Sequence, residues 1–341
     1  MKGGYLFTLY LLLLTMPGFS QPAKPDTAAT FTNPLLPGGP DPWVIQDKGI
    51  YYYMATTGRN ITIRKTKAMS ALAAAPATVV WTPPSQGPDA RDIWAPELHR
   101  LDGKWYLYYT AGSSDSVHPQ HTFVLENTAA DPTTGTWVSK GQVRDTAADD
   151  FAIDGTVFSY KGQRYFIWSG HNGKDNVQRL YIARMKNPWT LVSGRVEIAA
   201  PQYPWEKNGI NEGPEILLNQ QKDVFLVFSV SGCWTDDYAL GLLRLKKDAD
   251  PMVAANWTKM PEPILTGKPE NGAFSPGHNG FFKSANGKED WIIYHANSRA
   301  GQGCGGQRNP RMQPLAWDRN GLPVIGEPVK IGVAQRKPGG E

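Results

Sequence analysis

Charge is scarce in this sequence and nearly balanced between the two signs. Only 19% of the 341 residues are Asp, Glu, Lys or Arg, and the formal net charge is +4. No run of Lys and Arg is long enough to follow a phosphate backbone, which is the usual basis of nucleic-acid affinity. A nucleic-acid partner is therefore not expected. The length alone does not decide between two average domains and one large all-β domain.

Apolar runs long enough to cross a membrane are also missing. The apolar stretch from Tyr5 to Met16 is too short to span a bilayer comfortably. It follows Lys2 and precedes the small residues Gly18 and Ser20, an arrangement typical of a secretory signal. We expect residues 1–20 to be a signal peptide cleaved after Ser20, with an uncleaved membrane anchor as the alternative. The mature chain is then expected to be secreted or periplasmic and to have no membrane span.

Cysteine is almost absent. Cys233 and Cys304 are the only two, and neither lies near the predicted cleavage site, which argues against a bacterial lipid anchor there. In an oxidising compartment the two thiols could form a disulfide. Two separate buried thiols are the alternative, because a sequence does not give the distance between them.

A helical period of 3.6 residues is not sustained over several turns anywhere. The Ala-rich segment from Met69 is expected to be a loop or a single helical turn. Gly, Pro and aromatic residues are abundant instead. The chain has 35 Gly and 28 Pro, and 11% of its residues are aromatic. Aromatic residues favour strands, and Gly and Pro favour tight turns.

One hairpin outline is repeated five times along the chain. Each copy begins with a polar or small residue, runs through a short apolar strand, turns at a cluster such as "DKG" or "LDGK", and returns through an aromatic-rich strand. The copies begin at Asp41, Ala95, Ile153, Gly213 and Gly277. Further strand-like runs lie between them, so that each unit contains four strands. The repeat predicts an all-β fold, a five-bladed β-propeller that occupies residues 21–341 as a single domain.

Acidic residues recur at the start of these units. In a propeller the innermost strands line a central channel, so Asp41, Asp154 and Glu212 are expected to meet at one mouth of it. Like charges held together raise one another's pKa, which a structural core avoids and a catalytic site uses. A glycosidase needs one protonated and one ionised carboxyl group at the same pH. Taken singly, each acid could instead be a turn or solvated residue.

These motifs, in their order, resemble glycoside hydrolase family 43. They are "DPWV" at Asp41, "WAPELHRLDGKWYLYYTA" from Trp94, "AIDGTVF" from Ala152, "NEGPEILL" from Asn211 and "PGHNGFF" from Pro276. The resemblance implies an inverting hydrolase in which Asp41 is the general base that activates water and Glu212 is the general acid. Asp154 would orient the acid and raise its pKa. Glu215, three residues further along the strand, is the weaker candidate for the acid.

The resemblance also implies residues around these acids. Trp94 in "WAPE" would form a wall of the sugar subsite, or alternatively a plug between blades, and Arg311 in "NPRMQPLAWD" would lie near the sugar hydroxyls. His278 would contact a central calcium or sodium ion, although Asn279 follows it where many members have another histidine or a serine. His171 and His295 could line the same mouth, but structural roles are expected for both.

The substrate class is expected from the same likeness. It favours an exo-acting α-L-arabinofuranosidase, with a β-D-xylosidase or an endo-1,5-α-L-arabinanase as the alternatives within the enzyme class. Outside that class, a non-catalytic carbohydrate-binding propeller is the competing hypothesis, because one fold serves many functions. The expected partner is an oligosaccharide or polysaccharide, no organic cofactor is implied, and the protein is expected to be a monomer.

Overall fold

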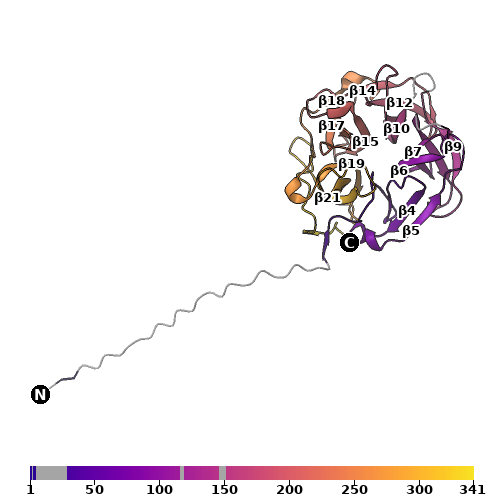
Figure 1. Cartoon of the computed structure of the whole chain (residues 1–341). Coiled ribbons are helices and arrows are strands. Elements are labelled where there is room, and N and C mark those ends of the chain that lie inside the picture. Colours follow the sequence, from indigo (N-terminus) through magenta and orange to yellow (C-terminus); the bar gives the residue numbers. More distant parts are fainter. Residues whose placement is uncertain (2, 5–28, 116–118, 146–150) are drawn as a thin grey trace.

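The strands of the computed structural model are arranged in a ring around a central axis (Figure 1). The structure describes residues 1, 3–4, 29–115, 119–145 and 151–341. Most of the predicted signal peptide, residues 1–20, lies outside these described residues. Each blade is an antiparallel sheet whose strands follow one another in chain order from the inside outward. The predicted five-bladed β-propeller is confirmed.

The blades coincide with the five units of the sequence repeat. The first contains β2 (Trp43–Asp47), β3 (Ile50–Met54), β4 (Ile61–Thr66) and β5 (Ala77–Trp81). The second contains β6 (Arg91–Leu101), β7 (Lys104–Gly112), β8 (Gln120–Asn127) and β9 (Val138–Gln142). The third contains β10 (Ala152–Tyr160), β11 (Gln163–Gly170) and β12 (Arg179–Asn187), and β12 pairs with both β13 (Thr190–Leu191) and β14 (Val196–Ala199).

The remaining two blades have the same plan. The fourth contains β15 (Asn211–Leu218), β16 (Val224–Val230), β17 (Ala239–Leu245) and β18 (Trp257–Lys259). The fifth contains β19 (Phe274–Lys283), β20 (Asp290–Asn297), β21 (Asn309–Trp317) and β22 (Pro323–Val324). The first two strands of every blade therefore form the hairpin that the repeat predicts.

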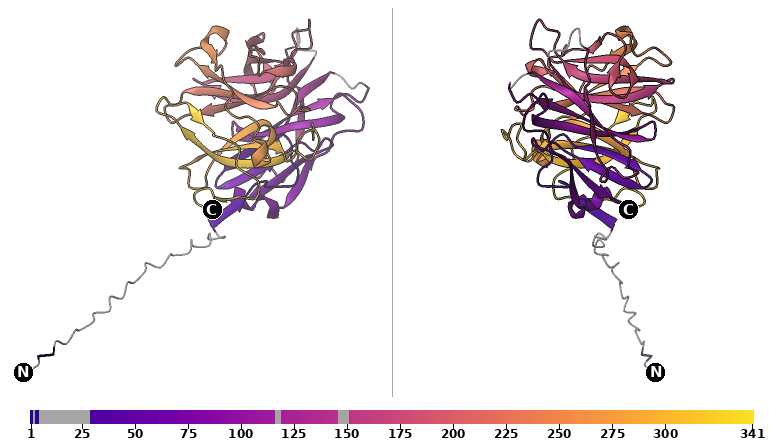
Figure 2. Two further views of the ribbon diagram at one scale, coloured as in Figure 1. Left: turned by 60° about the vertical axis from the view of Figure 1, so that its left-hand side comes forward. Right: turned by 90° about the vertical axis from the view of Figure 1, so that its right-hand side faces the viewer.

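The two ends of the described fold close the ring. Strand β1 (Thr30–Thr32) pairs with β23 (Ala334–Arg336) in a separate two-stranded sheet. Figure 2 shows the indigo start and the C-terminus side by side. The Asn33 side chain adds a bond to the fifth blade by donating to the Met312 carbonyl at 2.8 Å. The pairing gives the backbone groups of both terminal strands a partner.

The hydrophobic core lies between the blades. Among the described residues, five clusters of buried side chains each join the facing surfaces of two neighbouring blades. Trp105, Trp168 and Trp291, which are fully buried, anchor three of these layers. Alternate residues of a strand point to opposite faces, so every blade contributes apolar side chains to both neighbours.

Helices contribute little to the described part of the chain. The Ala-rich segment forms a short 3₁₀ helix, η2 (Met69–Ala74), whose Met69 and Leu72 side chains are buried. Ala71 has non-helical backbone angles, so the segment forms two short 3₁₀ turns joined at a kink, where the sequence predicts a loop or a single helical turn. No described helix is long and apolar enough to cross a membrane.

Candidate active site

The innermost strand of every blade bends at its entry into the ring. One residue at each bend has a positive φ, between 42° and 55°; these residues are Asp41, Ala95, Asp154, Gly213 and His278. Residues other than glycine seldom adopt such a backbone, so the surrounding structure must hold it in place. In the second to fifth blades the β-ladder is also interrupted at this point.

Hydrogen bonds between blades hold these bends. The backbone N–H of each bend residue donates to a side chain of the preceding blade. The acceptors are His295 Nδ1 for Asp41 (3.0 Å), Thr56 Oγ1 for Ala95 (2.7 Å), Thr110 Oγ1 for Asp154 (3.0 Å), Asp154 Oδ2 for Gly213 (3.1 Å) and Ser229 Oγ for His278 (2.8 Å). Only the fourth blade uses a carboxylate, and this contact fixes Asp154 beside the strand that carries Glu212.

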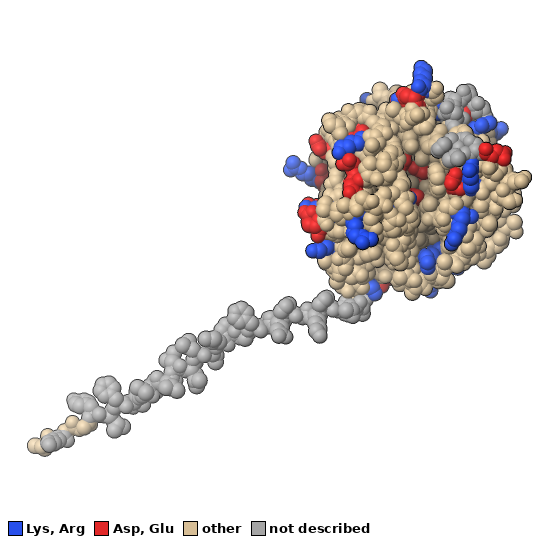
Figure 3. All heavy atoms as spheres, viewed as in Figure 1, with Lys and Arg blue, Asp and Glu red and all other residues tan. Residues whose placement is uncertain are grey.

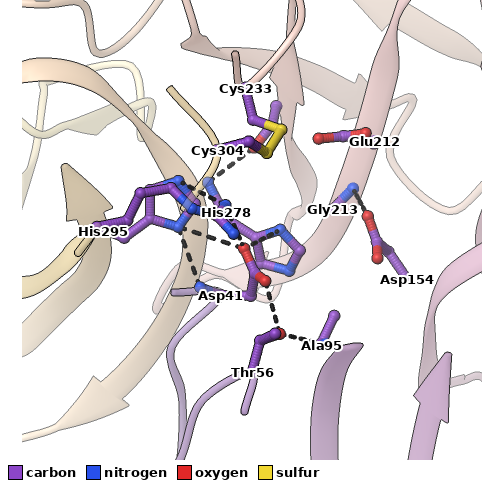
Figure 4. A network of polar contacts seen from close by, with 12 residues as sticks. Asp41, Thr56, Ala95, Asp154, Glu212, Gly213, Cys233, His278, His295 and Cys304 are labelled. Atoms are coloured by element: carbon purple, nitrogen blue, oxygen red, sulfur yellow. Dashed lines mark hydrogen bonds and ion pairs between the residues drawn. A yellow bond between two sulfur atoms is a disulfide. The ribbon is translucent and has the colours of Figure 1, made fainter. Parts of the chain in front are cut away.

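One cavity of about 550 Å³ borders all three predicted acids, Asp41, Asp154 and Glu212. Figure 4 shows Asp41 on one side of the group and Glu212 with Asp154 on the other. Asp41 and Asp154 are only 8% and 5% exposed, and Glu212 is half-buried. On the face seen in Figure 3, acidic atoms are visible in the hollow near the ring centre. The structure therefore brings together three carboxyl groups that are far apart in the sequence.

Asp41 is surrounded by hydrogen-bond donors and one cation. The Arg308 guanidinium donates to Oδ1 at 2.9 Å, and the Thr56 hydroxyl donates to Oδ2 at 2.6 Å. Burial by itself would raise the pKa of Asp41, but the charge of Arg308, together with the hydrogen bond from Thr56, outweighs it and holds this pKa below its usual range. Asp41 is thus ionised at neutral pH, as a general base must be.

His295 supports Asp41 without being a cation. Its Nδ1 accepts the Asp41 backbone N–H at 3.0 Å and therefore carries no proton. Burial, reinforced by the neighbouring Arg308, holds the pKa of His295 well below its ordinary value. The 3.4 Å approach of this ring to the Asp41 carboxylate is thus not a salt bridge, and Arg308 is the group that neutralises Asp41.

Glu212 has the opposite environment. The Tyr238 hydroxyl donates to its Oε1 at 2.7 Å, and Tyr238 is itself only 1% exposed. Burial raises the pKa of Glu212 to about 7, with a further increase from the charge of Asp41, while Tyr238 and Arg308 limit the rise. Burial, and then the charge of Glu212, also raises the pKa of Asp154 well above its usual range. The Asp154–Glu212 pair therefore holds a proton that Glu212 can donate near neutral pH.

Glu215 faces a different space. It borders a narrow cavity of about 10 Å³ together with Glu97 and Asn279, and it does not line the large cavity. Burial and the bond with Glu97 raise the pKa of Glu215. Its position agrees with the sequence-based choice of Glu212 over Glu215 for contact with a substrate.

The comparisons with known proteins agree with this arrangement of acids. The family model described as Glycosyl hydrolases family 43 matches residues 31–323. The chain belongs to this family. It is a glycoside hydrolase, and its cavity is the candidate active site of a family 43 enzyme.

Several proteins similar to this family 43 enzyme are named arabinofuranosidases. An extracellular exo-alpha-(1->5)-L-arabinofuranosidase of Streptomyces avermitilis is 39% identical over 96% of this chain and 70% of its own length. Alpha-L-arabinofuranosidase 43 of Humicola insolens is 35% identical over 91% of this chain and 66% of its own length. The crystal structure of an alpha-L-arabinofuranosidase from Lactobacillus brevis superposes with a TM-score of 0.83 at 30% identity, covering 89% of this chain and 98% of that one.

Only some of the other predicted residues of the family 43 site lie at the cavity. Trp94 and His278 line the cavity, whereas Arg311 does not. The Arg311 guanidinium is fully buried and donates to the Asn309 side chain and the Asn297 carbonyl. The placement of Arg311 beside the sugar is therefore corrected: the arginine that lines the cavity is Arg308. Positions three apart near the start of a strand point to opposite sides, which separates these two arginines.

The structure adds residues that the sequence-based reasoning did not select. Arg308 and Thr56 donate hydrogen bonds to Asp41, and Tyr238 donates one to Glu212, so all three contact the candidate catalytic carboxyl groups. Arg308 directly precedes β21. Its place in the same short motif as Arg311 is the one sequence feature that could have pointed to it. Neither Thr56 nor Tyr238 lies at the start of an inner strand, where candidate residues were sought.

His295 and His171, the other two histidines considered for the cavity mouth, have different surroundings. His295 is fully buried and accepts a hydrogen bond from the Asp41 backbone N–H, so it helps to hold Asp41 in position. The His171 ring stacks on Phe151 at 4.4 Å between ring centroids, and Phe151 lines the cavity.

The two cysteines are paired, which decides between the two alternatives. The Cys233–Cys304 disulfide joins the loop after β16 to the loop after β20, with 5.1 Å between the Cα atoms. Both cysteines line the cavity. A cross-link between residues 71 positions apart stabilises a fold by about 4 kcal/mol in the chain-entropy view.

The surroundings of His278 do not form a calcium site from protein groups alone. Within the described ranges, no cluster of three or more His, Cys, Asp and Glu side chains is arranged to hold a metal ion. Calcium takes six to eight oxygen ligands, whereas His278 approaches Asp41, which Arg308 already neutralises. A central calcium or sodium ion stays a prediction of the family resemblance, and no catalytic step is derived from it.

Proposed function

We propose that this family 43 enzyme is an exo-acting α-L-arabinofuranosidase that releases arabinose from arabinan or arabinose-decorated polysaccharides with inversion. The contrast between Asp41 and Glu212 supports the chemistry, because one cavity presents an ionised and a protonated carboxyl group together. The arabinofuranosidase names of the relatives, two of them extracellular exo-acting enzymes, support the choice of sugar. They also support an exported protein.

The proposed reaction uses one water molecule and two proton transfers. Asp41 removes a proton from a water as its oxygen attacks the anomeric carbon. Glu212 gives its proton to the departing glycosidic oxygen while the bond to the anomeric carbon breaks. Asp154, held by the Gly213 N–H, lies beside Glu212, and because the charge of Glu212 raises the pKa of Asp154, the pair keeps a proton before the reaction begins. All of these groups come from one chain, so we also propose that the protein acts as a monomer.

The test uses matched substrates. The enzyme is assayed with 4-nitrophenyl α-L-arabinofuranoside, 4-nitrophenyl β-D-xyloside and linear α-1,5-arabinan. Rapid hydrolysis of the arabinofuranoside, and single arabinose units as the first product from arabinan, are expected. Proton NMR recorded during turnover should show arabinose released first as the β-anomer.

Three other results would each contradict one part of the proposal. Preference for the xyloside would indicate a xylosidase. Arabinobiose and longer products appearing first would indicate endo action. Tight sugar binding without turnover by the wild type would favour a non-catalytic carbohydrate-binding protein.

A further inference from the structure

Trp234 is exposed at the edge of the cavity. Its side chain is 58% exposed, and it lines the same cavity as Glu212. Among the large apolar residues that are exposed in the described part of the chain, it is the only aromatic one. An exposed aromatic side chain in a cavity wall is a common sign of ligand contact.

The position of Trp234 is fixed by its own loop. A Cβ atom on Gly232 would lie 2.5 Å from the Trp234 ring, so the ring packs closely on the bare glycine backbone. Thr235 donates two bonds back to the Gly232 carbonyl, and Cys233 ties the loop to Cys304 in the next blade. Because the ring is held before a ligand arrives, binding to it loses little conformational entropy.

The loop belongs to the blade that carries the general acid. Glu212 on β15 pairs with Ser229 on β16, and Trp234 lies five positions after Ser229 in the loop that leaves β16. Asp41 approaches from a different blade. A general acid must lie beside the leaving group, since it protonates that oxygen. The Trp234 loop is thus on the side of the cavity where the leaving group departs.

The cavity has room for more than one sugar ring. Cavities of roughly 300 to 1,000 Å³ hold drug-sized ligands, and this one measures about 550 Å³. A pentose has only ten non-hydrogen atoms. Its ring has one face of C–H groups, which an indole can cover while the hydroxyl groups stay in water.

We infer that Trp234 forms a subsite for the leaving group, which takes the second arabinofuranosyl unit of an α-1,5-linked oligosaccharide. This inference rests on the proposed function. The cleaved arabinose occupies the space between Asp41 and Glu212, and the next sugar lies on the indole. Trp234 thereby favours a sugar chain over a small alcohol as the leaving group.

The test measures binding in a Glu212→Gln background, where turnover is suppressed. Isothermal titration calorimetry gives Kd for L-arabinose and for α-1,5-arabinotriose. Adding Trp234→Ala should weaken arabinotriose binding by about tenfold and change arabinose binding by less than about twofold. Adding Trp234→Phe should restore most of the loss, since it keeps an aromatic face. Arabinose binding by the Trp234→Ala protein also reports that it is folded.

A matched control removes another exposed apolar side chain of the same blade. Leu218, on β15, is 46% exposed and does not line the cavity. Leu218→Ala should leave both Kd values unchanged. Equal weakening for both sugars in Trp234→Ala, or none for arabinotriose, would overturn the subsite. If Glu212→Gln bound neither sugar and the wild type cleaved no arabinofuranoside, the proposed function would fail, and this inference with it.

Discussion

The two sides of the cavity differ in the partners they give to a carboxyl group. Asp41 is almost fully buried, yet Arg308 and Thr56 keep it ionised. Glu212 is more exposed, yet its pKa rises to about 7, because burial and the charge of Asp41 outweigh the bond from Tyr238 and the charge of Arg308. Burial by itself raises the pKa of both groups. The neighbouring charges and donors therefore decide which of the two acids is ionised at neutral pH.

The contacts between blades show how this difference arises from a repeated fold. At four junctions the bend N–H donates to a hydroxyl or imidazole, and at the junction of the third and fourth blades it donates to Asp154. This exception places a second carboxyl group next to Glu212. The scaffold thus creates the proton-holding side by changing one acceptor in a repeated pattern.

Removing the base should have the largest effect. Asp41→Ala should lower kcat by about 10³-fold or more, even on substrates with good leaving groups, because water still has to be activated. Steady-state rates on 2,4-dinitrophenyl and 4-nitrophenyl arabinofuranosides measure this. Asp290→Asn, which alters an aspartate bonded to Trp317 outside the cavity, serves as the control. Near-normal rates for Asp41→Ala would refute its assignment as the base.

Changing the cation beside the base should have a smaller effect that depends on pH. Because Arg308 lowers the pKa of Asp41, Arg308→Met should raise that pKa and protonate the base at higher pH. The acidic limb of the kcat/KM profile should move to higher pH, so that kcat/KM at pH 5 falls by about tenfold or more. Arg336→Met, which removes a surface partner of Glu289, is the matched control. An unmoved acidic limb would show that Arg308 does not set the charge of the base.

Removing the hydroxyl beside the acid should have the smallest effect. Tyr238 lowers the pKa of Glu212 by donating to its ionised form, so Tyr238→Phe should move the basic limb of kcat/KM to higher pH. About half of Glu212 is already protonated at pH 7, so the rate at that pH should rise by at most about twofold. Tyr294→Phe removes a buried hydroxyl that bonds Gln313 outside the cavity and should leave the limb in place. A basic limb that moves to lower pH in Tyr238→Phe would contradict this account.

The repeat allowed the fold and the positions of the acids to be predicted from the sequence. Once each unit is a blade, the bends at the blade entries occupy equal positions around the ring. Asp41 and Asp154 are bend residues and Glu212 directly precedes the bend residue Gly213, so the three acids meet. The same reasoning extends to Trp94 and His278, which also line the cavity. It depends only on backbone register, which hydrophobic alternation specifies strongly.

Contacts that depend on side-chain direction could not be predicted in this way. Arg308 and Arg311 lie in one short motif, and only the three-dimensional path of the chain shows which of them reaches Asp41. Tyr238 reaches Glu212 from the position directly before β17, where nothing in the sequence distinguishes it from other core aromatics. The Cys233–Cys304 pairing cannot be predicted from sequence because it depends on the distance between two loops of different blades.

The pH dependence of kcat/KM is the most direct test of the central claim that the two sides of one cavity set the acid and the base apart. With 4-nitrophenyl arabinofuranoside the wild type should give a bell-shaped profile. Its basic limb should lie near pH 7, because Glu212, with a pKa of about 7, must be protonated to act. Glu212→Gln, assayed with an activated 2,4-dinitrophenyl leaving group, should retain the acidic limb and lose the basic one. A basic limb that persists unchanged in Glu212→Gln would assign the proton to another group and contradict the account.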